Sequence, residues 1–307
     1  MIVATNRKHK KRINREWSDK PQDKGGLTWV MIDENNGSVK KISSSDSKLP
    51  DEVRKELLSE LEKHSTQEPR LVSFVPGGRP FQYSDFLDFK KRITNNLPTT
   101  ERLAGVPIGF SPAFSDGIRI VPIRKEFQKS HTGWRSFSNF LDAIASLEPV
   151  VHSLILQSGG NDVCARAIVK RGEDNLPKID RIVATGSAIP RSAISTKPPS
   201  KKLSSKKPVP DAQLLIDCCS HFQSYYRSDD STLQLLPATM FGEGPLPLGL
   251  EPPEFPYLYP TKSTFVDCHR IVAKKEHKAY EHSPEILRSI ANFLNGGTPN
   301  DDVLEMD

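Results

Sequence analysis

Short polar blocks of serine, glycine, asparagine and histidine recur along the chain, and together they could perform acyl-transfer chemistry. Such chemistry needs a nucleophile, a histidine base and fixed N–H donors that stabilise an oxyanion. The Gly-x-Ser-x-Gly pattern of many serine hydrolases is absent from the chain. The blocks are Ser44-Ser45-Asp46-Ser47, Pro76-Gly77-Gly78, Ser158-Gly159-Gly160-Asn161-Asp162, Ile189-Pro190-Arg191 and Glu281-His282-Ser283-Pro284.

Each block lies at the end of a predicted strand or at the start of a predicted helix. Apolar runs predict strands at residues 39–43, 70–75, 150–157 and 181–188, and amphipathic spacing predicts helices at 50–64, 84–93, 137–147, 211–227 and 283–296. This alternation predicts a three-layer α/β/α domain with a central parallel sheet over residues 36–296. The carboxyl ends of parallel strands share one edge, so we expect the blocks to meet there.

The order of the blocks, with LILQSGGNDV as its strongest part, resembles the SGNH (GDSL-type) hydrolase superfamily, particularly its divergent versions in mobile-element proteins. The resemblance extends over most of the chain and implies a flavodoxin-like α/β/α fold. It also implies that Ser47 is the nucleophile and His282 the general base. The oxyanion hole would then combine the Ser47 amide, an amide at Gly77 or Gly78, and the side chain of Asn161.

Two departures from the family pattern leave the activity open. Ser45 stands where the family has glycine, and Ala279 stands where the family has the aspartate that orients the histidine. Asp267 with His269 is a second candidate pair, with a spacing that differs by one residue. The expected function is therefore an SGNH-like serine hydrolase that acts on an ester, weakly or not at all.

The alternative is a non-catalytic adaptor of the same fold that binds nucleic acid or protein through basic segments. Each site residue also has a purely structural explanation. Ser47 could cap or turn the chain, Gly78 could belong to a tight turn, Asn161 could form an Asx turn, and His282 could be a polar neighbour of a helix cap.

The composition indicates unpacked ends. Of 307 residues, 36% are hydrophobic and 26% charged, and the formal net charge is +5. We expect residues 1–35 to form a basic, disordered tail, residues 192–210 a Lys/Pro/Ser-rich loop, and residues 297–307 an acidic tail. The basic segments from Arg7 to Arg12 and from Lys197 to Lys207 are expected to be mobile and to bind polyanions weakly.

Several classes of protein are not indicated by the sequence. The chain has no window of 18 apolar residues and no leader-like charge order, so an intracellular protein, cytoplasmic or nuclear and without membrane contact, is expected. The four cysteines lack zinc-ligand spacing, so no metal site is expected. A G-x-x-x-x-G-K-[ST] loop is also absent, so no nucleotide cofactor is expected.

Overall fold

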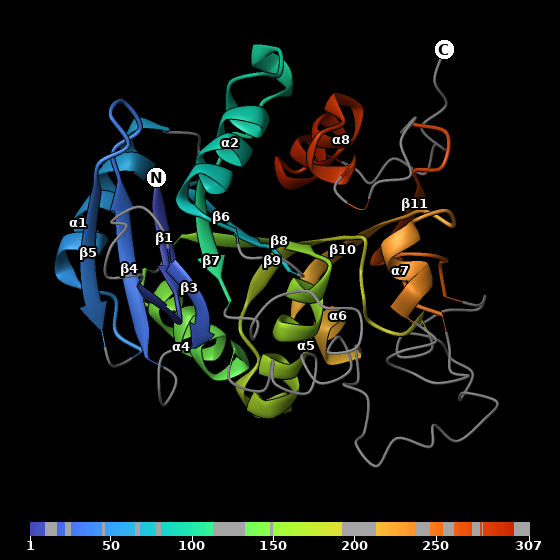
Figure 1. The fold of residues 1–307 in the computed structure, drawn as a ribbon, viewed down its shortest axis with the longest axis horizontal. Coiled ribbons are helices and arrows are strands. Elements are labelled where there is room, and N and C mark those ends of the chain that lie inside the picture. The colour runs from blue at the N-terminus through green and yellow to red at the C-terminus, as the bar shows by residue number, and fades with distance from the viewer. Residues whose placement is uncertain are drawn as a thin grey trace.

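A computed structural model arranges the chain around one nine-stranded sheet (Figure 1). The structure describes residues 1–9, 17–21, 26–44, 47–64, 68–77, 81–112, 133–147, 150–191, 213–236, 246–253, 261–271, 277 and 279–297. The strand order is β11-β10-β9-β8-β6-β7-β1-β4-β5. All strands from β11 to β1 in this order are parallel, whereas β4 is antiparallel to both of its neighbours. The bounds are β1 Ile2–Thr5, β4 Leu27–Ile32, β5 Val39–Ser44, β6 Arg70–Val75, β7 Val106–Ser111, β8 Val151–Gln157, β9 Ile179–Thr185, β10 Cys219–Tyr226 and β11 Ser263–Asp267. A separate antiparallel pair consists of β2 (Arg7–His9) and β3 (Trp17–Pro21).

Helices cover both faces of the sheet, so the protein has three layers (Figure 1). One face packs against α2 (Tyr83–Thr94) and α8 (Pro284–Leu294). The other packs against α1 (Asp51–Lys63), α4 (Gly133–Ala145), α5 (Gly159–Arg171) and α6 (Gln213–Asp217). The short helix α7 (Ser231–Leu236) follows β10. The predicted three-layer α/β/α class is confirmed, and one strand next to the edge of the sheet, β4, runs opposite to the others.

The prediction of a disordered tail over residues 1–35 was wrong for two apolar runs within it, which form strands β1 and β4. Strand β1 lies between β7 and β4, and it pairs Ala4 with both Phe110 and Trp29. Val3, Ala4, Trp29 and Val30 are fully buried. The partner strand β7 lies about a hundred residues away along the chain, so the local pattern, which is dominated by neighbouring charges, did not reveal the pairing.

The predicted mobile basic segment also begins with a buried residue. Arg7 is 1% exposed, and its guanidinium donates hydrogen bonds to Pro112 O at 2.9 Å and Phe81 O at 3.4 Å. Residues 10–16, the segment from Lys197 to Lys207, the predicted loop 192–210 and residues 298–307 lie outside the described residues.

Most predicted elements match observed ones, with one exception that affects the site. Helix 211–227 was predicted, but the chain instead forms the short helix α6 and then strand β10, which pairs with β9 and β11. Residues 222–225 of β10 are all buried, as expected for a strand covered on both faces. The helical spacing of Leu215, Cys219, Phe222 and Tyr226 was therefore misleading.

Candidate active site

Ser158 forms the turn between strand β8 and helix α5, in a backbone conformation that is rare for serine. Its φ is 51° and its ψ is −120°, and it is the only non-glycine residue with positive φ in the described part of the chain. Such a conformation costs about 1–3 kcal/mol and persists only where the surroundings enforce it. A Cβ atom on Gly160 would lie 2.0 Å from Val75 O, so glycine is required two residues after Ser158.

Gly77, which follows β6, packs directly on this turn. A Cβ atom on Gly77 would lie 2.3 Å from both Gly159 N and Gly160 N, so only glycine permits this approach. Gly77 N donates to the side-chain oxygen of Gln157 at 3.4 Å. The first N–H groups of a helix have no intrahelical acceptor, so the amino end of α5 offers donors for an oxyanion beside Ser158.

A buried carboxylate and a histidine form a second part of the site. Asp230, which follows β10, is 2% exposed, and its Oδ2 lies 2.7 Å from Nδ1 of His277. The other oxygen of Asp230 accepts from the backbone N–H groups of Thr232 and Leu233 at 3.0 Å each. With its proton on Nδ1, the neutral ring has its lone pair on Nε2. That Nε2 is buried and has no hydrogen-bond partner among the described residues.

The end of strand β9 joins the two parts. Ser158 N donates to Thr185 O at 2.9 Å, which fixes the serine turn against the last residue of β9. The next residue, Gly186, has a φ of +48°, and a Cβ atom there would lie 3.0 Å from Cε1 of His277. Ser158 and His277 therefore contact adjacent residues of the same strand end. They are not joined by a hydrogen bond, and such bonds are often long in enzymes without substrate.

The neighbouring aspartate is engaged elsewhere. Arg227 donates to both carboxylate oxygens of Asp229 at 2.9 Å, which keeps this carboxylate beside the guanidinium. His269 Nδ1 lies 3.6 Å from Asp229. The predicted second pair, Asp267 with His269, meets only through the His269 backbone N–H at 2.8 Å. Asp230 is thus the carboxylate that contacts His277.

Two of the four residues predicted from the family resemblance, Ser47 and Asn161, follow strands that are far apart in the sheet. Ser47 is half-buried in the bend between β5 and α1. Four strands separate β5 from β8, so at about 4.8 Å per strand Ser47 lies about 24 Å from the turn that contains Asn161. The predicted nucleophile and the predicted oxyanion side chain are therefore apart, and Gly78 lies outside the described residues.

Asn161 and His282 have other partners. The Asn161 amide donates to the backbone carbonyls of Leu156 and Ser158 at 3.1 Å each, so it faces its own turn. His282 is exposed, and its Nε2 lies 3.4 Å from a guanidinium nitrogen of Arg92. These contacts do not favour the roles that the resemblance implied for the two side chains.

Sequence reasoning did not select Ser158, Asp230 or His277. Ser158 lies inside a block that was selected for its glycines and asparagine, and Leu156 stands where the familiar motif has its first glycine. Asp230 follows a strand that was predicted as helix, although the aromatic run before Asp229-Asp230 could have indicated a strand end. His277 lies in a polar stretch with no distinguishing pattern.

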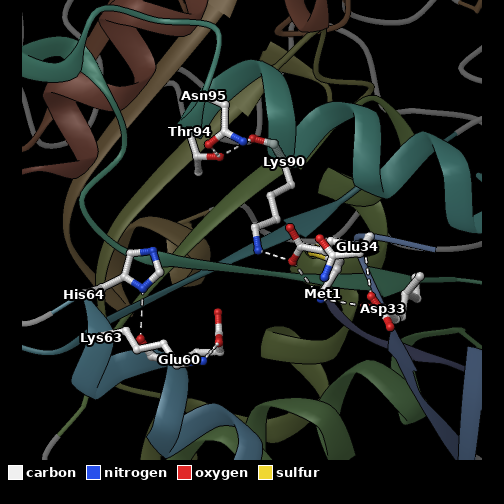
Figure 2. A network of polar contacts seen from close by, with 11 residues as sticks. Met1, Asp33, Glu34, Glu60, Lys63, His64, Lys90, Thr94 and Asn95 are labelled. Atoms are coloured by element: carbon white, nitrogen blue, oxygen red, sulfur yellow. Dashed lines mark hydrogen bonds and ion pairs between the residues drawn. The ribbon is translucent and has the colours of Figure 1, made fainter. Parts of the chain in front are cut away.

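A different polar cluster lies at the opposite, amino edge of the sheet (Figure 2). Glu34 accepts hydrogen bonds from Lys90 and from the Met1 amino group. Burial raises the pKa of Glu34, but these cations outweigh burial and the net pKa is lowered. Nearby, Glu60 pairs with Lys63 at 2.7 Å. The cluster borders a cavity of about 550 Å³. Glu34 and Glu60 pair with the basic groups of the same cluster.

The part of the chain that the structure describes contains neither a metal-binding cluster nor a membrane-spanning helix. No group of three or more His, Cys, Asp or Glu side chains could hold a metal ion there. Among the helices described, none combines the length and the apolar character needed to span a bilayer.

Comparison with known proteins gives distant structural similarity only. No family model matches the chain, and no curated protein matches it in sequence. A cutinase-like protein from Cryptococcus sp. is similar over 75% of this chain and 96% of its own, with 13% identity and a TM-score of 0.35. A protein provisionally described as a cell surface hydrolase from Lactobacillus plantarum WCFS1 is similar over 78% and 96%, with 11% identity and a TM-score of 0.40. At these values the similarity does not bear on activity, and the SGNH resemblance stays unconfirmed.

Proposed function

We propose that this protein is a serine hydrolase that cleaves carboxylic esters with Ser158 as nucleophile, His277 as general base and Asp230 as the carboxylate that orients the base. The observation that carries the proposal is the strained backbone of Ser158 at a strand-to-helix turn. This geometry resembles the nucleophile elbow of α/β-hydrolases, in which the chain order is serine, then acid, then histidine. Ser158, Asp230 and His277 occur in that order.

The proposed reaction has two steps. In the first, the Ser158 hydroxyl attacks the ester carbonyl while Nε2 of His277 takes its proton, and that proton then passes to the departing alcohol. In the second, water attacks the acyl-enzyme and gives a proton to His277, and His277 passes that proton to the departing Ser158 oxygen, which releases the carboxylic acid and the free serine. Asp230 holds the ring with Nδ1 protonated, which leaves Nε2 free to accept.

Charge on the carbonyl oxygen would be stabilised by backbone donors. The Gly159 amide is the residue after the nucleophile, the usual first donor of this geometry, and it lies at the positive end of the α5 dipole. A second donor would come from the chain just after β6, because Gly77 there contacts Gly159 directly. Donors fixed in this way stabilise charge that develops only in the transition state.

The test is covalent labelling with a fluorophosphonate probe, followed by peptide mass spectrometry and by hydrolysis of p-nitrophenyl butyrate. We expect label on Ser158, and no labelling or turnover in Ser158→Ala. Asp230→Asn should lower kcat by about 10⁴-fold, as for other triads. Asp229→Asn is the matched control and should retain most activity, because Asp229 pairs with Arg227 instead of His277.

Ser47→Ala distinguishes this proposal from the one based on family resemblance. Full labelling in Ser47→Ala would agree with Ser158 as nucleophile. Loss of labelling in Ser47→Ala with retention in Ser158→Ala would refute the proposal and restore Ser47. A wild-type protein that is folded yet unreactive toward both probes would also refute it.

A further inference from the structure

The strained turn at Ser158 needs side chains that hold it, and one candidate lies in the first turn of α5. Asn161 is fully buried, and each hydrogen of its amide nitrogen reaches one backbone carbonyl. The acceptors are Leu156 O and Ser158 O, both at 3.1 Å. They lie on the two sides of Gln157, so a single side chain connects the end of the strand with the nucleophile.

The orientation of this amide is fixed by chemistry. A carboxamide has two N–H donors on nitrogen and none on oxygen, and both neighbours are carbonyl oxygens that can only accept. The nitrogen must therefore face the turn. The amide oxygen of Asn161 is buried and without a hydrogen-bond partner among the described residues, which costs stability. A leucine of the same shape would avoid this cost, so the contribution of asparagine lies in its two hydrogen bonds to the turn.

We propose that Asn161 is a positioning residue that holds Ser158 in its reactive conformation, an inference that rests on Ser158 being the nucleophile. Asn161 acts through the backbone and does not touch substrate. Two backbone hydrogen bonds already hold the turn. Ser158 N donates to Thr185 O, and Ser158 O accepts from Asn161 N at 3.2 Å. The Asn161 side chain adds the connection to Leu156 O, which restrains the residue before the turn begins.

The experiment uses Asn161→Leu, which keeps the side-chain shape and removes both donors. The fluorophosphonate labelling rate and the kcat for p-nitrophenyl butyrate should fall about 100-fold, the loss expected when a reacting atom is misplaced by about 1 Å. KM and the thermal unfolding midpoint should change little, because the substrate is not contacted and a buried unpaired oxygen is removed. A residue with only a stabilising role would lower the unfolding midpoint and leave the reactivity of the folded protein unchanged.

The matched control is Asn175→Leu. Asn175 is exposed just beyond the carboxyl end of α5, where its amide donates to Arg171 O at 3.4 Å. The Asn175→Leu protein should therefore be labelled at the wild-type rate. If Asn161→Leu does not fold, Asn161→Ser takes its place. Serine keeps one donor on a shorter side chain, so the labelling rate should fall less than the roughly 100-fold expected for Asn161→Leu.

Folded Asn161→Leu or Asn161→Ser that labels at the wild-type rate would overturn the inference and leave the proposed nucleophile intact. Labelling of the wild type that does not depend on Ser158 would overturn both.

Discussion

Gly186 provides a sharp test of where the base lies. Its backbone has a φ of +48°, and a Cβ atom would lie 3.0 Å from Cε1 of His277 and 3.0 Å from Cε2 of Tyr280. Gly186→Ala therefore has two separate effects. The left-handed backbone costs an L-residue about 1–2 kcal/mol of folding free energy. The new methyl group also requires the two rings to move by a few tenths of an ångström, and one of them is the proposed base.

Gly172 allows these effects to be separated. It follows α5 with a φ of +75°, and no atom lies within 4 Å of the position of its Cβ. With a ψ of 169°, Gly172 has a backbone that is almost exclusive to glycine, so Gly172→Ala should lose about 1–3 kcal/mol of stability through the backbone alone. Gly186→Ala should lose a similar amount and, in addition, lower kcat about 10-fold or more, because misplacement of a catalytic group by a fraction of an ångström is costly.

Urea unfolding gives the stability of both variants, and p-nitrophenyl butyrate hydrolysis gives kcat below the unfolding transition. Two results would refute the reasoning. One is a Gly186→Ala protein with wild-type kcat, which would mean that the ring beside Gly186 is not the base. The other is an equal loss of kcat in Gly172→Ala, which would mean that activity follows global stability and not the position of His277.

Three other substitutions test the packing of the sheet and its helices, one of them beside the site. Burial lowers the pKa of His152 to about 4, so the unfolded chain gains a proton first as the pH falls, and stability should drop by about 2 kcal/mol between about pH 7 and pH 5. In urea titrations His152→Gln, which can still bond the Ser73 hydroxyl, should remove that part of the acid sensitivity. Gly160→Ala would place its Cβ 2.0 Å from Val75 O, so circular dichroism should show a loss of about 3 kcal/mol of stability, with labelling of the serine abolished. Arg181 Nη1 donates to two carbonyls at the carboxyl end of α8, Phe293 O at 2.8 Å and Gly297 O at 2.9 Å, and Arg181→Lys should cost about 2 kcal/mol in urea unfolding because the shorter lysine side chain does not place its nitrogen at the Nη1 position.

Elements defined by local pattern could be predicted from the sequence. Helix α8 is an example, since Ser283 caps it by accepting from Ile286 N at 3.3 Å, and Pro284 occupies its first turn. Strand β8 was also recognisable, because a run buried on both faces is apolar almost throughout. In both cases the information lies within one stretch of residues.

Elements defined by distant partners could not be predicted. Strand β1 has four residues, and its burial depends on β4 and β7, so its apolar character could not be distinguished from that of a tail. Strand β10 has apolar and aromatic residues that fit a helix equally well, and its position between β9 and β11 decides the matter. Because of that error Asp230 was not recognised as a site candidate. A carboxylate becomes a candidate when it follows a parallel strand, since sites lie at the carboxyl ends of such strands.

The serine site was hidden for a different reason, which concerns what a nucleophile turn physically requires. Sequence patterns demand a glycine two residues before the serine, but here that position is Leu156, whose side chain is buried in the hydrophobic core. The crowding occurs elsewhere. It lies at Gly160, where a Cβ would meet Val75 O, and at Gly77, where a Cβ would meet the first amides of α5. A turn of this kind needs glycine wherever two backbones approach each other, and one of those positions belongs to a different loop about eighty residues earlier in the chain. The requirement is thus one of contact in space, and a pattern confined to five consecutive residues does not capture it.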